Sequence, residues 1–189
     1  MSSVEDKNYI YLYGGLSHLL FLIVFSSFIQ AKNTRRIILV LGHFFISLTF
    51  LLRFFTEYKN FIITGIIGHS IVTIFFILTT ILDNMKYRIT SDKHIFNFIC
   101  ILGQIGMILH YITIGVDREN ENIFMIMNII TCILLITFYY NVAIKQTKKD
   151  RVLIYPLLLL CILYMLFTIE TVMKFTGVDL TIIKDKYLN

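Results

Sequence analysis

Six apolar stretches, each close to twenty residues long, alternate with short polar breaks along this chain of 189 residues. A helix that crosses the hydrocarbon core of a bilayer needs roughly 20 predominantly apolar residues. The stretches cover residues 9–29, 37–55, 61–82, 95–114, 123–144 and 152–175. Outer-membrane strands would alternate apolar and polar residues, and these runs do not. The sequence therefore predicts an all-α integral membrane bundle of six transmembrane helices, forming a single domain over residues 1–189.

The composition agrees with a membrane protein and excludes several other classes. Hydrophobic residues make up 57% of the chain and charged residues 15%, whereas soluble domains have about 45–50% and 25%. Ordinary soluble, disordered and fibrous proteins are therefore excluded. The net charge of +5 does not indicate nucleic-acid binding, because the basic residues form no long run or stripe. We expect the lipid bilayer to be the main partner, although the composition does not indicate which membrane.

The charged residues in the polar breaks predict how the bundle is oriented. The breaks after the first, third and fifth stretches contain ten Lys and Arg residues and three acids. The rest of the chain has the other seven basic and nine acidic residues. Because Lys and Arg are retained on the cytoplasmic side, we predict that these three breaks are cytoplasmic and that both termini lie outside or in a lumen. No signal-peptide cleavage site follows the first stretch, so it is predicted to be a true span.

Ionisable side chains inside apolar spans are costly and are therefore candidates for function. With the predicted orientation, one polar residue from each span lies in the half of the membrane near the termini: His18, Arg53, His69, His110, Asn128 and Glu170. His43 and Gln104 lie deeper. These positions predict a water-accessible cavity that opens outward and binds an anionic or peptide-like ligand, a metal or a proton.

A structural role for the same residues is the alternative. Polar groups near the ends of spans can reach the interface or form interhelical hydrogen bonds. In that interpretation Arg53 forms an interhelical ion pair with Glu170, the acidic residue at a similar depth. Glu170 can also pair with Lys174 on its own helix, at a spacing of i, i+4.

A short motif occurs twice. Gly14-x-x-x-His18 in the first stretch recurs as Gly65-x-x-x-His69 in the third, 51 residues later. Internal repeats are common in transporters. A small residue one turn before the histidine also allows close helix packing, and the sequence slightly favours this second explanation.

The histidines also allow a second function, that of a membrane cytochrome. Haem can be held by two histidines from different helices at matching depth, and His18, His69 and His110 meet that condition. A zinc site is less well indicated, because no two ligands have the i, i+3 or i, i+4 spacing of helix-borne sites. Cys100, Cys132 and Cys161 lie far apart inside the spans and form no disulfide or zinc motif.

No hydrolase, protease or phosphate-binding motif is present, so the sequence indicates no catalytic residue and does not favour an enzyme. The leading prediction is a small multi-pass receptor or transporter. The third possibility is a non-catalytic subunit of a larger membrane complex, whose polar groups would contact neighbouring subunits.

The region 13–53 resembles the start of the KDEL receptor family, the lumenal retrieval receptors of the early secretory pathway. The likeness rests on the run Gly14-Gly15-Leu16-Ser17-His18-Leu19-Leu20, on Arg53, which follows the histidine by 35 residues, and on Thr90-Ser91-Asp92 after the third stretch. The resemblance implies a lumenal N-terminus and a lumenal peptide-binding cavity lined by His18 and Arg53. That family has seven helices, whereas six are predicted here.

Overall fold

The computed structural model describes residues 9–27, 34–56, 59–86, 91–146, 152 and 154–177. Its described residues form six long helices and no strand: α1 (Tyr9–Ser27), α2 (Thr34–Phe55), α3 (Asn60–Lys86), α4 (Ser91–Gly115), α5 (Asn122–Gln146) and α6 (Ile154–Thr176). The predicted all-α fold is confirmed. Each predicted span falls on one helix, although residues 28, 29 and 153 lie outside the described residues.

Five of the described helices, α2 to α6, are long and apolar enough to cross a membrane. The apolar part of α1, Tyr9–Phe25, is shorter. A multi-pass membrane protein is therefore confirmed, and the sixth span stays a prediction. The 19 residues of α1 correspond to a length of about 28 Å, at 1.5 Å per residue, close to the roughly 30 Å of the hydrocarbon core.

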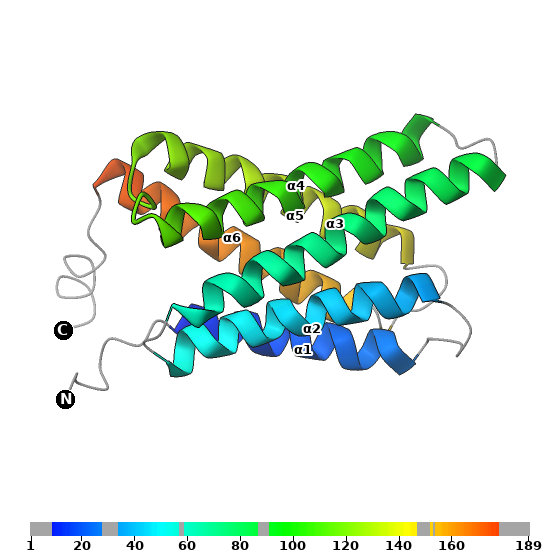
Figure 1. Ribbon diagram of the computed structural model, residues 1–189, viewed down its shortest axis with the longest axis horizontal. Coiled ribbons are helices and arrows are strands. Elements are labelled where there is room, and N and C mark those ends of the chain that lie inside the picture. Colours follow the sequence, from blue (N-terminus) through cyan, green and yellow to red (C-terminus); the bar gives the residue numbers. More distant parts are fainter. Residues whose placement is uncertain are drawn as a thin grey trace.

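The six helices form a closed ring in which each helix packs against its neighbours in the sequence and α6 returns to pack against α1. Successive helices are antiparallel, so the helix termini gather at two ends (Figure 1). We call one the terminal end, where α1 begins and α6 ends. We call the other the basic end, where the helices meet the three predicted basic breaks. Near the basic end, α2, α3, α4 and α5 extend two to four residues beyond the predicted spans, because polar residues outside the hydrocarbon core can continue a helix.

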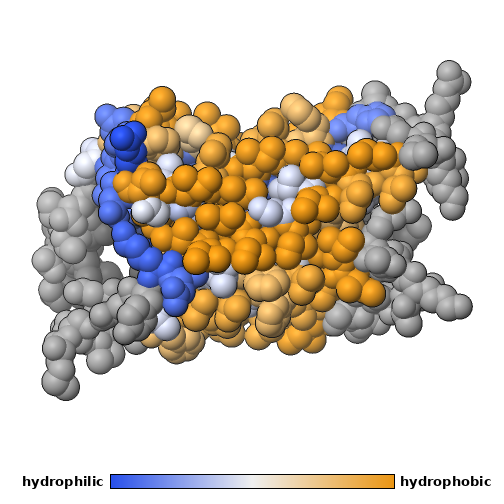
Figure 2. Space-filling view, viewed as in Figure 1, coloured by the Kyte–Doolittle hydropathy of each residue, from blue (hydrophilic) through white to orange (hydrophobic). Residues whose placement is uncertain are grey.

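The outside of the ring is apolar and its inside holds much of the polar chemistry. Exposed isoleucine, leucine and phenylalanine side chains cover the outer faces of the helices. Figure 2 shows them as a broad apolar surface, bounded at the terminal end by a hydrophilic stripe. Among the described residues, the polar side chains that are at most 2% exposed include His18, His43, Thr49, His69 and Gln104. This arrangement suits a lipid environment, in which polar groups are satisfied internally.

Glycines bring α2 and α3 into close contact. A Cβ added to Gly68 would lie 2.9 Å from the backbone nitrogen of Ile46 and 3.1 Å from the backbone oxygen of Gly42. The neighbours are backbone atoms, which a side-chain rotation cannot move away. Gly68 is therefore required for the short distance between α2 and α3. His43 lies on α2 and His69 on α3, so this contact also positions the two histidines inside the ring.

Candidate functional site

A polar pocket of about 40 Å³ lies inside the ring at the terminal end. Four of the six predicted site residues line it: Arg53 from α2, His110 from α4, Asn128 from α5 and Glu170 from α6. Further polar lining comes from Tyr11, Glu119, Asn120, Thr171 and Lys174. His18 and His69 do not line it. The structure thus brings four of the predicted residues together and places the other two elsewhere.

Arg53 lies in the last turn of α2 and is held by two aromatic rings. Its guanidinium carbon is 4.2 Å from the ring centre of Tyr11 and 5.1 Å from that of Phe61. Both distances are typical of cation–π contacts, which hold a cation without neutralising its charge. In the part of the chain that the structure describes, no carboxylate lies within 4.0 Å of the Arg53 side chain. The pocket therefore contains a guanidinium whose N–H groups can donate to an anion.

Glu170 forms its ion pair with Lys174 on its own helix and not with Arg53 on α2. Its Oε1 is 3.2 Å from Nζ of Lys174, one turn along α6. The predicted i, i+4 pair is thus present, whereas the alternative pair with Arg53 is absent from the described contacts. The pocket lining therefore holds two cations, Arg53 and Lys174, and two carboxylates, Glu119 and Glu170.

Asn128 is fixed by hydrogen bonds within the bundle. Its Nδ2 donates to Oγ1 of Thr171 over 2.8 Å, and that hydroxyl donates to the backbone oxygen of Phe167. The side-chain oxygen of Asn128 is 3.9 Å from the sulfur of Cys132. This network connects α5 to α6 and orients polar atoms toward the pocket.

A smaller cavity of about 20 Å³ shares Arg53, His110, Asn128 and Phe167 with the polar pocket and has more aromatic lining. Phe50, Tyr111 and Phe167 contribute to its wall. The chemical character thus changes from polar near the terminal end to aromatic deeper in the ring.

His18 is fully buried and its partner is His43, which the sequence had placed deeper than the site residues. The two Nδ1 atoms are 3.0 Å apart. Each neutral imidazole carries one N–H, so one Nδ1 donates and the other accepts, and both rings cannot be protonated while the bond exists. The Nε2 atom of His18 is buried and has no hydrogen-bond partner.

His69 has an equivalent arrangement one hairpin further along the chain. Its Nδ1 is 2.6 Å from Oε1 of Gln104, which accepts the N–H, and its Nε2 is also buried without a partner. Gln104 follows His43 by 61 residues, and His69 follows His18 by 51. The two offsets differ, so the pairs are not at equivalent sequence positions, but each hairpin, α1–α2 and α3–α4, joins a buried histidine to a polar side chain of its second helix.

The Gly-x-x-x-His motif has a packing explanation, because each glycine leaves space for an aromatic ring from the next helix. A Cβ on Gly14 would lie 2.9 Å from the Phe50 ring, and one on Gly65 would lie 2.7 Å from the Tyr111 ring. Phe50 stacks on His18 with ring centres 5.5 Å apart, and Tyr111 lies 5.7 Å from His69 in the same way. Each glycine thus makes room for an aromatic ring from the next helix, and that ring covers the histidine one turn away.

Haem or metal binding at these histidines stays a prediction. Both Nδ1 atoms are hydrogen-bonded and both Nε2 atoms are free, which is the arrangement of many histidine ligands. However, neither the His18 ring nor the His69 ring lines the polar pocket or the smaller cavity, and a porphyrin would have to displace the aromatic rings stacked on them. Within the described ranges, no three His, Cys, Asp or Glu side chains are close enough to hold a metal ion.

Sequence reasoning missed Tyr11, Thr171 and Lys174 as pocket residues, and it treated His43 and Gln104 as separate from the site. Tyrosine and threonine are common on spans, and nothing in their spacing distinguishes the ones that face a pocket. The partnership of His18 with His43 had no local signal either, because it joins two helices.

No protein-family model, no curated protein and no solved structure matches this chain. The resemblance of residues 13–53 to the KDEL receptors therefore stays a prediction. The Thr90 of that resemblance lies outside the described residues.

Proposed function

We propose that this protein is a small membrane receptor or transporter whose polar pocket binds the carboxylate of a small-molecule or peptide ligand. The observation that supports this most is Arg53, which faces the pocket between two aromatic rings without a carboxylate partner among the described residues. An arginine at a span end needs a carboxylate, a carbonyl or an anionic ligand. Guanidinium groups recognise carboxylates through paired N–H donors.

The size of the pocket limits what part of a ligand it admits. A water molecule needs roughly 10–15 Å³ of such space, so the 40 Å³ of the polar pocket suits a single small group. A terminal carboxylate fits this limit, with the rest of the ligand outside, near the loop that contributes Glu119 and Asn120. If the predicted orientation holds, the pocket faces the exterior or a lumen.

The test compares two pairs of compounds, each pair differing only in whether it carries a carboxylate or an amide. We suggest the tetrapeptide Lys-Asp-Glu-Leu with a free C-terminal carboxylate and the same peptide with a C-terminal amide, together with succinate and its diamide. Thermal unfolding in detergent can be followed with a fluorogenic maleimide, because Cys100, Cys132 and Cys161 are buried and become reactive on unfolding. The carboxylate form should stabilise the protein, by about 2.7 kcal/mol at one hundred times its dissociation constant.

Matched variants decide whether Arg53 is responsible. Arg53→Gln should remove the stabilisation, whereas Arg118→Gln should keep it, because Arg118 lies at the same end but outside the pocket. Equal responses to the carboxylate and amide forms, or no response to any carboxylate, would contradict the proposal. Uptake of the labelled peptide into liposomes would then distinguish a transporter from a receptor.

The cytochrome alternative has a simple test. The absorbance spectrum of the protein, purified from cells supplied with haem, should show a Soret band if His18 and His69 hold the cofactor. A spectrum without that band would leave the receptor or transporter and the subunit of a larger membrane complex.

A further inference from the structure

The polar pocket contains charges of both signs, and two of its four charged side chains are not used by each other. Glu170 is paired with Lys174 over 3.2 Å. The other two, Arg53 and Glu119, line the same pocket and form no ion pair among the described residues. A ligand in this pocket therefore meets one cation and one anion that have no partner of opposite charge.

Tyr11 of α1 shows how these charges are arranged. Its ring centre is 4.2 Å from the guanidinium carbon of Arg53, and Glu119 and Glu170 both lie within electrostatic range of its hydroxyl group. Arg53 is half-buried, whereas Glu119 is exposed on the connection between α4 and α5. The unpaired positive charge thus lies on the inner side of the pocket and the unpaired negative charge on its outer side.

The size of the pocket limits how far apart two charged groups of one ligand can be. A volume of 40 Å³ corresponds to a sphere about 4 Å across, in which a water molecule takes roughly 10–15 Å³. In an α-amino acid the ammonium nitrogen is only about 2.5 Å from the carboxylate carbon, because a single Cα joins them. Both groups of such a molecule can share the pocket, whereas a simple anion would place its charge near Glu119 without compensation.

The smaller cavity next to the polar pocket limits the side chain of the ligand. Its volume of about 20 Å³ is little more than the space of one water molecule, so it admits a group of the size of a methyl. Its own lining, beyond the residues shared with the polar pocket, is Phe50, Met107, Tyr111 and Cys132. These apolar and aromatic walls suit a methyl group better than a polar one.

We propose that the polar pocket binds a small zwitterionic α-amino acid of the size of alanine. Its carboxylate contacts Arg53, its ammonium group faces Glu119, and its methyl group occupies the smaller cavity. This inference rests on the proposed carboxylate site and adds two further contacts to it. One molecule without net charge then satisfies both unpaired charges of the pocket.

The experiment compares alanine with propionate, which differ only in the ammonium group. Dissociation constants are obtained from the concentration dependence of maleimide-detected unfolding of the full-length protein in detergent. Alanine should bind about tenfold more tightly than propionate, because a charge-assisted hydrogen bond is added. Alaninamide, without a carboxylate, should not stabilise the protein, and γ-aminobutyrate, whose charges are further apart, should bind more weakly than alanine. Equal affinities for alanine and propionate would overturn the proposal.

A pair of variants tests the contact with the ammonium group. Glu119→Gln should remove the tenfold preference for alanine over propionate. Glu121→Gln is the matched control, because Glu121 lies in the same connection but pairs with Arg118 over 3.5 Å and does not line the pocket. An alanine preference that survives Glu119→Gln would overturn the assignment of the ammonium group.

The smaller cavity is tested through the side chain of the ligand. Alanine should bind about fourfold more tightly than glycine, the gain expected from burying one methyl group, whereas 2-aminobutyrate should bind more weakly than alanine. Cys132→Ala enlarges the cavity and should bring 2-aminobutyrate to the affinity of alanine, while Cys100 and Cys161 still report unfolding. If 2-aminobutyrate binds the unaltered protein as tightly as alanine, the size limit is wrong.

The two proposals fail in different ways. If neither propionate nor alanine stabilises the protein, the carboxylate site itself is wrong, and the amino acid assignment falls with it. If propionate binds in a manner that Arg53→Gln abolishes, and alanine binds no better, the carboxylate site stands and only the amino acid assignment is overturned.

Discussion

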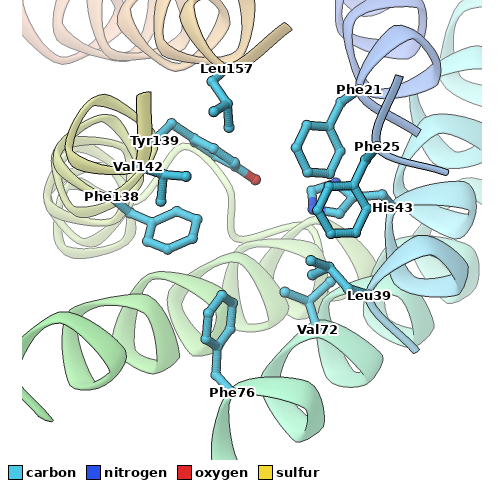
Figure 3. Close-up of a pocket in the computed structure, with 10 residues that line it drawn as sticks. All are labelled: Phe21, Phe25, Leu39, His43, Val72, Phe76, Phe138, Tyr139, Val142 and Leu157. Carbon is cyan, nitrogen blue, oxygen red and sulfur yellow. The ribbon is translucent and has the colours of Figure 1, made fainter. Parts of the chain in front are cut away.

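The two ends of the helix ring enclose cavities of opposite character. At the terminal end the polar pocket contains Arg53, His110, Asn128 and Glu170. Near the basic end a second cavity of about 80 Å³, the apolar pocket, has no charged side chain among the described residues that line it, which include Phe21, Phe25, Val72, Phe76, Phe138 and Val142 (Figure 3). The segments of the sequence next to these helix ends nevertheless contain ten of the 17 basic residues. The middle layer, from Phe50 through His18 to His43, separates them by stacking and one hydrogen bond. Charged side chains thus line the interior of the ring at the terminal end, whereas at the basic end the charged residues belong to the segments outside the ring.

The physical reason lies in where each charge can be hydrated. Basic residues at the basic end belong to segments beyond the apolar spans, where water and lipid head groups are available, so the interior there needs no polar partner. Arg53 instead lies on a span, in the last turn of α2, and contacts the rings of Tyr11 and Phe61. An interior cation requires polar neighbours, and the polar pocket supplies them.

The largest expected effect comes from disturbing the close contact between α2 and α3 at Gly68. Gly68→Val should cost about 3 kcal/mol, because the added side chain meets backbone atoms of α2 and forces the helices apart. Thermal unfolding measured by maleimide reactivity checks this value. Gly115→Ala is the control, since its Cβ would meet Ile62 at an ordinary 3.8 Å. Equal stability of the two variants would show that α2 and α3 can separate without cost.

The His18–His43 bond should have the next largest effect. His18→Leu or His43→Leu leaves the other Nδ1 buried without its partner, which costs about 1–3 kcal/mol. The double variant should lose less than the sum of the single losses, because no unpaired Nδ1 then remains. A double-mutant cycle on unfolding free energies measures the difference. Additive losses would mean that the hydrogen bond does not stabilise the layer between the two pockets.

These results define how much the sequence could predict. The number and position of the helices followed from the lengths of the apolar stretches, because hydrocarbon thickness fixes how many apolar residues a span needs. The grouping of Arg53, His110, Asn128 and Glu170 followed from helix direction, since residues near one end of antiparallel helices share a depth.

The direction in which each side chain points from its helix could not be predicted in the same way. Depth was a poor guide for His18 and His69, because a residue at suitable depth can point to a pocket or to a neighbouring helix. The interhelical partners His43 and Gln104 had been left apart from the site for the same reason. The apolar pocket had no sequence signal, since phenylalanines that line a cavity and those that face lipid are equally apolar.

A smaller effect is expected from the aromatic rings that hold Arg53. Tyr11→Leu should weaken stabilisation by the carboxylate peptide by about 0.5–1 kcal/mol, the size of a cation–π contact. Tyr9→Leu is the control, because Tyr9 is exposed and contacts Phe54 rather than Arg53. The measurement is the shift in unfolding temperature with peptide. An equal loss in both variants would indicate a general effect on α1 instead of a contact with Arg53.

The smallest effect concerns the rim of the polar pocket, where Lys59 and Asp117 form an ion pair of 2.6 Å. Their side chains are 60% and 80% exposed, and exposed pairs contribute about 0–1 kcal/mol. Asp117→Asn should therefore change the unfolding free energy by less than about 0.5 kcal/mol.

The backbone at Asp117 should matter more than its charge. Asp117 has φ of 58° and ends α4 in a Schellman motif, with the nitrogen of Arg118 donating to the oxygen of Thr113. Asparagine tolerates this left-handed conformation, whereas alanine pays about 1 kcal/mol for it. Asp117→Ala should thus be less stable than Asp117→Asn, and Asp117→Gly should lose little. If instead Asn and Ala are equally destabilising, the ion pair, and not the helix end, holds the loop that borders the polar pocket.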